Sequence, residues 1–249
     1  MCIRDSAYAE PHLVVCGQVE RIRDSYVTVK QNPSDSSAKH PLWSLDTIDI
    51  PYTHLVYALG SHMPDPLRHE TYTKKEGIAW MKVNQKRIDA SRDIIIIGGG
   101  ALGVEMATDI ASQCKKRGTS KNITLIHSRQ QLLPNFDVRI HEIVHKELLD
   151  LGVHVVLGHR LATAEGCPLG SNIRQIADTS MASDVPKDTM DTIASAPRQQ
   201  VRTTLGLELE CDLLLMCTGQ QPNSEIMAEF SPGSVNPDSR LVLSLIHIS

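Results

Sequence analysis

One stretch of the sequence decides the fold, and it reads Asp93-Ile94-Ile95-Ile96-Ile97-Gly98-Gly99-Gly100-Ala101-Leu102-Gly103. The β-branched apolar run at 93–97 predicts a strand that is buried on both faces, as in a parallel sheet. The glycines follow at once, and residues 101–116 are typical of a helix. A strand, a glycine-rich turn and a helix in this order predict the first βα unit of a dinucleotide-binding fold.

Each glycine of the Gly98-x-Gly100-x-x-Gly103 pattern has its own physical task. The first allows the tight turn, the second lets the backbone approach a pyrophosphate, and the third lets the helix pack close to the strand. Free N–H groups and the positive end of the helix dipole then hold the phosphates. The other members of the expected phosphate loop are Gly99, Ala101 and Leu102. The alternative is a glycine-rich turn without a ligand.

Strands and helices continue to alternate through residues 90–217, which predicts an α/β fold with a doubly wound parallel sheet. The further elements are a strand at 123–126, a helix at about 139–150, a strand at 153–157 and a last buried strand at 212–217. Residues 166–200 are rich in Ser, Asp, Thr and Pro, and we expect a disordered insertion there. A β-pair at 201–204 and 207–211 follows it.

The end of the second strand determines which nucleotide fits. An NAD site has an acid there that bonds the ribose hydroxyls, but this sequence has His127, followed by Ser128 and Arg129. We assign His127 and Arg129 to the ribose end. Arg129 with Ser128 also suits a 2′-phosphate, so the choice between NADH and NADPH stays open. The alternative is that Arg129 is a solvated loop residue.

Two residues are candidates for the nicotinamide end. Glu105 lies two positions beyond Gly103, in what we expect to be the first helical turn, where it either faces the nicotinamide or compensates the helix dipole. Gly219 follows the last strand, and ligands of such sheets bind beyond the carboxyl ends of the strands. We name no catalytic acid or base, because hydride chemistry belongs to the cofactors.

The segment His141-Glu142-Ile143-Val144-His145 matches the HExxH pattern of zinc proteases. We expect no metal there, since the segment falls on the predicted helix at 139–150 and no third ligand follows at the required spacing. We expect the apolar stripe of that helix to be buried: Ile140, Ile143, Val144, Leu148 and Leu151.

Composition excludes several classes of protein. Apolar residues make up 41% and charged residues 22%, which is ordinary for a globular protein. The net charge of −4 argues against nucleic-acid binding. No apolar run approaches the roughly 20 residues of a membrane helix, which leaves peripheral membrane association open. The six cysteines show no CxxC spacing, so neither a zinc cluster nor a disulfide scaffold is predicted and a reducing intracellular environment is expected.

The N-terminal third predicts small antiparallel pairs before a helix. Residues 12–16 and 26–30 are expected to form one hairpin, and 47–50 and 53–59 a second pair of strands. A helix is expected at about 75–90, although its apolar spacing is loose. The codons that can encode residues 1–6, read as their reverse complement, encode residues 243–248. We therefore expect 1–6 and 243–249 to derive from a sequencing adapter.

Three motifs in order resemble the pyridine nucleotide–disulfide oxidoreductase superfamily. Residues 52–61, ending Ala58-Leu59-Gly60-Ser61, resemble the strand and ATG motif of its FAD domain, with Leu59 in place of Thr. Residues 98–105 resemble its NAD(P)H fingerprint, and 205–223 resemble its second such segment. The resemblance is greatest to the apoptosis-inducing-factor-like branch, which includes ferroptosis suppressor proteins.

The resemblance implies a two-dinucleotide flavoprotein architecture: a partial FAD domain at 7–89, an NAD(P)H domain at 90–217 and a return into the FAD domain at 218–242. It implies FAD in the parent protein, with Leu59 and Gly60 on the flavin side, and NADH or NADPH as the hydride donor. Electrons would pass to a quinone-like acceptor. The FAD fingerprint and the later Gly-Asp motif fall outside the sequence, so the fragment by itself is expected to be inactive.

Two other functions stay open alongside this one. The first is a flavin-free dehydrogenase or nucleotide-binding module, and the second is a non-enzymatic, NADH-sensing effector of apoptosis or redox signalling. The family includes cytoplasmic, mitochondrial and membrane-associated members, so the compartment stays open as well.

Overall fold

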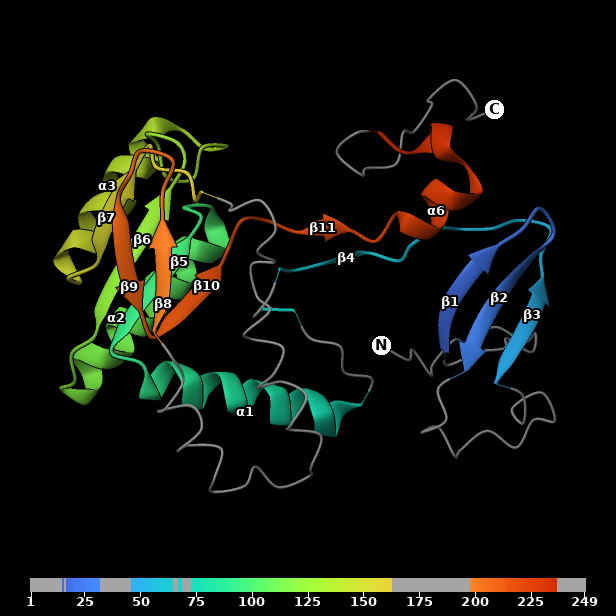
Figure 1. Ribbon diagram of the computed structural model, residues 1–249, viewed down its shortest axis with the longest axis horizontal. Helices are drawn as coiled ribbons and strands as arrows, with labels where there is room; N and C mark the ends of the chain where they lie inside the picture. Colours follow the sequence, from blue (N-terminus) through green and yellow to red (C-terminus); the bar gives the residue numbers. More distant parts are fainter. Residues whose placement is uncertain are drawn as a thin grey trace. The chain divides into compact units, whose positions relative to one another are not determined.

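The computed structural model describes residues 15, 17–31, 46–64, 67–68, 73–162 and 198–236. These residues divide into two compact units (Figure 1). The larger unit is His62–Gln221, and the smaller unit combines described residues up to Ser61 with those from Pro222 onward. The expected insertion at 166–200 lies outside the described residues as far as residue 197, and both predicted adapter segments lie outside them too.

A four-stranded parallel sheet forms the centre of the larger unit, which confirms the predicted α/β fold. The strand order is β10-β5-β6-β7, and in this order the bounds are Leu213–Met216, Asp93–Ile97, Asn122–His127 and His154–Leu157. In β5, Ile94 to Ile97 pair with Leu213 to Met216 on one side and Ile123 to Ile126 on the other. All four of these isoleucines are buried, as a strand with neighbours on both sides and both faces requires.

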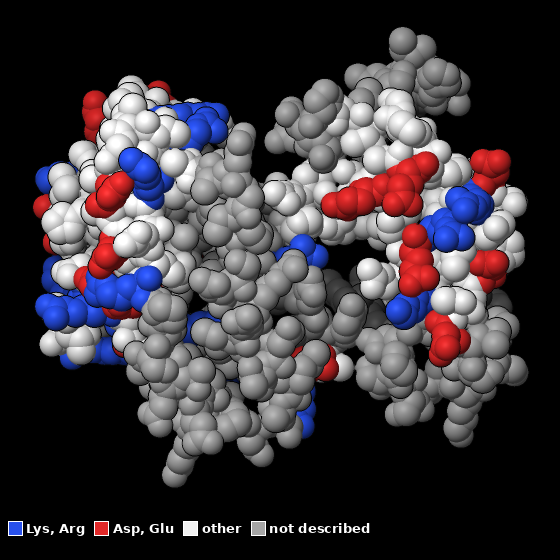
Figure 2. Space-filling model, in the orientation of Figure 1, with Lys and Arg blue, Asp and Glu red and all other residues white. Residues whose placement is uncertain are grey.

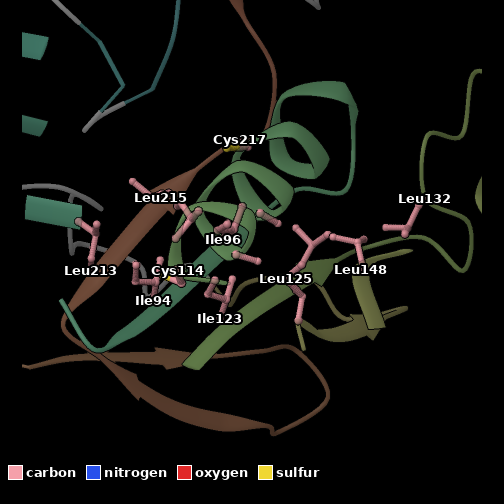
Figure 3. Packing of buried hydrophobic residues seen from close by; sticks show 14 residues of the cluster. Ile94, Ile96, Cys114, Ile123, Leu125, Leu132, Leu148, Leu213, Leu215 and Cys217 are labelled. Atoms are coloured by element: carbon pink, nitrogen blue, oxygen red, sulfur yellow. The ribbon is translucent and has the colours of Figure 1, made fainter. Parts of the chain in front are cut away.

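One face of this sheet is covered by helices. Ile94 and Ile96 point to this face, where they pack with residues of α2 (Ala101–Arg117) and α3 (Val138–Asp150). Figure 3 shows this cluster between the strands and α2. Both helices begin within one residue of the predicted position. The expected stripe of α3 is only partly right: Leu148 is fully buried, but Ile143 is 68% exposed and Ile140 is 40% exposed.

An antiparallel hairpin covers the other face. Its strands are β8 (Gln199–Arg202) and β9 (Glu208–Cys211), which pair with each other. Ile95 and Ile97 pack against this hairpin. The expected insertion therefore ends earlier than predicted, because Gln199 and Gln200 belong to β8. Among the described residues, the larger unit is a three-layer arrangement of helices, parallel sheet and hairpin.

The helix α1 (Lys74–Ala90) lies where a helix was predicted at 75–90. Thr73 and Glu76 form a capping box at its start. Its apolar face is weak: Val83 is buried, whereas Ile78 and Met81 are exposed.

The smaller unit contains a three-stranded antiparallel sheet in the order β1-β2-β3. The strands are Gly17–Ile22, Tyr26–Gln31 and Thr47–Pro51. The first strand predicted at 12–16 lies outside the described residues except for residue 15, and the described pairing with β2 begins at Gly17. The turn at 23–25 brings Ile22 opposite Val27, and Ile22, Val29 and Ile48 are buried. A short helix, α6 (Glu225–Phe230), packs against β1 and is followed by a 3-10 turn, η2 (Pro232–Ser234).

The strand predicted at 53–59 is wrong. The backbone there is irregular, and only β4 (Ser61–His62) forms, paired with β11 (Gln221–Pro222). Among the described residues no strand runs beside 53–59, and Val56 is 88% exposed. An apolar β-branched run without a neighbouring strand has no partner for its N–H and C=O groups, so the local pattern alone does not make it a strand.

The described helices include none that is both long and apolar enough to span a membrane. On the face drawn in Figure 2, acidic and basic side chains are interspersed over the described residues.

Candidate nucleotide-binding site

The glycine loop joins β5 to α2 at the carboxyl edge of the sheet. Gly98 has φ = +113°, a left-handed conformation that favours glycine. Its N–H donates to the Ile126 carbonyl at 2.8 Å, which ties the turn to the adjacent strand. A Cβ on Gly103 would overlap the Gly98 carbonyl. These two glycines therefore serve the turn and the close helix–strand packing, as the fingerprint requires.

Gly100 has a different environment. It is the N-cap of α2 with φ = −79°, which any residue can adopt, and a Cβ there would meet nothing within 4 Å. No side chain caps this helix. The N–H groups of the first helical turn, which begins with Ala101 and Leu102, have no partners within a helix, so they and the helix dipole are available to an anion. Open space in front of Gly100 is what an approaching pyrophosphate needs.

The loop stands at the switch point of the sheet. From β5 the chain crosses to β6 on one side, while β10 flanks β5 on the other. Open α/β sheets bind ligands at the carboxyl ends of the strands beside such a point. Gly219 follows β10 at this edge, exposed and with φ = +109°. Cys217, the residue after β10, is buried, and burial raises the pKa of its thiol to about 11. It therefore stays a neutral packing residue at physiological pH.

His127 ends β6, and its side chain turns inward rather than toward solvent. It is 8% exposed, and its Nδ1 accepts a hydrogen bond from the Gly99 N–H at 3.0 Å. Nδ1 is thus not free for a ribose hydroxyl. Within the described residues, its Nε2 is buried without a hydrogen-bond partner. Burial lowers the pKa of His127, the charge of Arg129 lowers it further, and the nearby backbone of Gln131 opposes the shift in part.

Arg129 lies in the loop after β6 and is exposed. Its carbonyl accepts from the Gly158 N–H at 3.1 Å, and the His127 carbonyl accepts from the His159 N–H at 3.0 Å. These bonds join the loop after β6 to the loop after β7. A second exposed arginine, Arg160, lies in that loop, and it was not among the site residues predicted from the sequence. The predicted order of parallel strands could have identified it, because loops after adjacent parallel strands meet at one edge of the sheet.

Glu105 is the fifth residue of α2 and is exposed, so it lies beyond the first turn. The expectation that it sits in the first turn is wrong: the helix begins at Ala101 as predicted, and its fifth residue falls just beyond the first turn. A charge compensates the helix dipole mainly within the first turn. The alternative that Glu105 only compensates the dipole is therefore weakened.

The HExxH segment lies on α3, and its histidines are engaged locally. His141 Nδ1 accepts from the Leu132 N–H at 3.0 Å, and the rings of His141 and His145 stack with centroids 5.4 Å apart. Within the described part of the chain, no group of three or more His, Cys, Asp or Glu side chains gathers as a metal site would require.

The two flavin-side candidates lie in the smaller unit. Asn223 Nδ2 donates to the Leu59 carbonyl at 3.0 Å, and the Asn223 N–H donates to the Gly60 carbonyl at 3.0 Å. The Tyr57 hydroxyl donates to the Asn223 carbonyl. Asn223 therefore ties together the two segments that resemble the family motifs. A second strand–glycine loop–helix cradle, which the FAD pyrophosphate needs, is not among the residues described for this unit.

Comparison with known proteins assigns the family. The pyridine nucleotide-disulphide oxidoreductase family matches residues 13–242. The chain belongs to this family. Within it, Fe-regulated protein 8 of Mycosarcoma maydis is 34% identical over 227 residues, which are 84% of this chain and 49% of that protein. Human ferroptosis suppressor protein 1 is 29% identical over 181 residues, 70% of this chain and 40% of that protein. An apoptosis-inducing factor homologue of Dictyostelium discoideum is 22% identical.

The chain spans about half the length of the curated relatives that it matches. Solved structures of family enzymes share its fold. A water-forming NADH oxidase from Lactobacillus brevis bound to NADH has a TM-score of 0.54 at 16% identity, covering 89% of this chain and 40% of that one. An engineered NADPH oxidase derived from it, bound to NADPH, has a TM-score of 0.56 at 16% identity, covering 91% and 41%.

Proposed function

We propose that this chain supplies the NAD(P)H-binding part of an FAD-dependent oxidoreductase. The intact protein would pass a hydride from NAD(P)H to the flavin and electrons onward to a quinone-like acceptor. The observation that carries the proposal is the open space at Gly100, in front of an uncapped helix N-terminus. Membership of the pyridine nucleotide-disulphide oxidoreductase family supports the redox chemistry.

The residues of the site have separate tasks in this proposal. The backbone N–H groups of Gly100, Ala101 and Leu102 bind the pyrophosphate. The Gly99 N–H lies beside it and donates to His127. Glu105 and Gly219 lie toward the nicotinamide, on the two sides of the switch point. Leu59 and Gly60 belong to the flavin side. FAD, when bound, supplies the electron relay, and the chain's own residues bind and orient the nucleotide.

Replacing Gly100 tests nucleotide binding without disturbing the fold. The Gly100→Ala variant adds a methyl group at a position that the protein tolerates, since nothing lies within 4 Å. The same methyl occupies the path of the pyrophosphate, and a steric cost of about 1–3 kcal/mol corresponds to roughly 5- to 150-fold weaker binding. The measurement is a titration of the protein with NADH and with NADPH, followed by calorimetry.

Gly233→Ala is the matched control. A Cβ on Gly233 also meets nothing within 4 Å, and this residue lies in η2, outside the site. Its affinity for both nucleotides should equal that of the wild type. If Gly100→Ala binds as tightly as Gly233→Ala, the pyrophosphate does not lie on this loop and the proposal fails.

The redox half is tested on the protein at the length of its relatives. That protein, loaded with FAD, should oxidise NADH or NADPH when a soluble quinone is added. Nucleotide binding and bound flavin without oxidation would favour the non-enzymatic alternative. Oxidation that does not require flavin would favour a flavin-free dehydrogenase.

A further inference from the structure

The ribose end of the site is built by two loops held side by side. The loop after β6 and the loop after β7 share two backbone hydrogen bonds, from Gly158 to Arg129 and from His159 to His127. The first of these loops also contacts the glycine loop, through the bond between Gly99 and His127. The order along the edge of the sheet is therefore glycine loop, β6 loop and β7 loop, which is the direction in which a dinucleotide's adenosine extends.

The described residues at these two strand ends carry no carboxylate, and the first carboxylate of the β6 loop is Asp137, at the N-cap of α3, where it pairs with Arg139. Residues 127–131 read His-Ser-Arg-Gln-Gln, and residues 158–162 read Gly-His-Arg-Leu-Ala. The acid that would accept hydrogen bonds from the ribose 2′-hydroxyl of NADH is absent. The residue in its position, His127, is buried and already bonded to Gly99. A 2′-phosphate at the strand ends would meet no like charge from residues 127–131 or 158–162.

The loops carry two exposed arginines instead. Within the described residues, neither Arg129 nor Arg160 forms an ion pair, whereas Arg117 and Arg139 pair with Asp89 and Asp137. Arg129 lies two residues after the end of β6. Burial lowers the pKa of His127, and the charge of Arg129 lowers it further. An unpaired guanidinium is suited to bidentate recognition of a phosphate.

We propose that Ser128, Arg129 and Arg160 form a subsite for the 2′-phosphate, so that this chain selects NADPH over NADH. The inference rests on the proposed function, because it extends the nucleotide site described above. Arg129 is the principal ligand, since it lies two residues after His127, the strand end where the acid of an NAD site stands. Ser128 adds a hydroxyl donor, and Arg160 adds positive charge from the neighbouring loop.

Binding of matched coenzymes tests the subsite. The wild-type protein is titrated with NADPH and NADH, and with 2′,5′-ADP and 5′-AMP, which lack the nicotinamide. We expect each phosphorylated probe to bind about tenfold or more tightly than its partner, the value of one charge-assisted bidentate contact. Arg129→Ala should weaken NADPH binding far more than NADH binding and so remove most of this preference. Arg129→Glu should reverse the preference, because a carboxylate repels the phosphate and accepts from the ribose.

Arg117→Ala is the matched control. Arg117 ends α2, at the edge of the sheet opposite the phosphate loop, and its exposed ion pair contributes little to stability. This variant should bind both coenzymes as the wild type does. Raised salt should weaken NADPH binding more than NADH binding in the wild type, and this difference should be smaller in Arg129→Ala, which keeps only Arg160.

The outcomes separate the inference from the function on which it rests. Equal affinity of the wild type for NADPH and NADH, or an equal loss of both in Arg129→Ala, overturns the 2′-phosphate subsite and leaves nucleotide binding intact. Failure of the wild type to bind either coenzyme overturns the proposed function and the subsite together. Retained NADPH preference in Arg129→Glu also overturns the subsite, whatever its effect on stability.

Discussion

His127 determines how the glycine loop is held. Its neutral imidazole accepts from the Gly99 N–H through Nδ1, so the proton of the neutral ring resides on Nε2. Protonation of Nδ1 would remove the acceptor and place a charge in a buried position beside Arg129. Both effects disfavour the charged ring in the folded protein, and its pKa is lowered accordingly.

This lowered pKa predicts a loss of stability in mild acid. The unfolded chain takes up a proton as the pH falls below about 6.5, the ordinary histidine value. The folded protein takes up this proton only at lower pH. The stability that neutral His127 contributes is therefore complete above about pH 6.5 and declines between the two pKa values. The expected slope from this group is at most about 1.4 kcal/mol per pH unit. Urea denaturation between pH 8 and pH 5, followed by circular dichroism, measures it.

A His127→Asn variant isolates the contribution. The asparagine Oδ1 can take the place of Nδ1 as acceptor for Gly99 and does not titrate. We expect this variant to lose less stability between pH 7 and pH 5 than the wild type. The control is His154→Asn, at an exposed position of β7, which should follow the wild-type curve. Parallel curves for wild type and His127→Asn would contradict the assignment of this loss of stability to His127.

The candidate site was predictable to different degrees at different residues. The roles of Gly98 and Gly103 follow from a local turn and a local contact, so the fingerprint alone indicates them. The direction of the His127 side chain depends on its hydrogen bond with Gly99, 28 residues away. No local pattern contains that information. Arg160 was missed because its loop becomes part of the site only through pairing between β6 and β7.

At the scale of elements, the parallel strands were predictable because burial on both faces leaves a continuous apolar run. The segment at 53–59 has a similar run but no neighbouring strand among the described residues, and it does not form one. The helix α3 shows the converse: its spacing predicted a buried stripe, yet Ile143 faces solvent. Periodicity gives the type of an element, whereas packing decides which apolar residues are covered.

The helix α1 depends on its cap more than on its apolar face. The Glu76 N–H donates to Thr73 Oγ1 at 3.2 Å, and the Thr73 N–H donates to Glu76 Oε2 at 3.0 Å. Because Val83 is the one buried residue of this helix, we expect Thr73→Ala to lower the free energy of opening its first turn by about 1 kcal/mol. Amide hydrogen exchange of α1 measures this directly.

Thr119→Ala serves as the comparison for the cap. Thr119 is exposed in the loop after α2, and its backbone N–H donates to the Cys114 carbonyl at 3.0 Å, a bond that alanine keeps. Its side chain caps no helix in the described chain. Exchange in α1 should be unchanged by this replacement. Equal exchange rates in Thr73→Ala and Thr119→Ala would show that the capping box does not hold the helix.

At the scale of the whole molecule, the two units differ in how much apolar surface they bury. Both clusters of buried residues on the parallel sheet lie within His62–Gln221. The described core of the smaller unit consists of Ile22, Val29 and Ile48 on a three-stranded sheet. A small sheet with few buried residues is marginal by itself. The sequence predicted a nucleotide domain at 90–217, and α1 adds to the compact unit at its beginning.

We therefore expect a polypeptide of residues 62–221 to fold by itself and to bind NADPH as tightly as the full chain does. All residues proposed for the phosphate loop, the nicotinamide end and the 2′-phosphate subsite lie within it. Its urea unfolding should be a single cooperative transition, and calorimetric titration gives the affinity. An unfolded polypeptide would mean that residues outside 62–221 are needed for folding. A folded polypeptide that no longer binds NADPH, while the full chain does, would contradict the prediction.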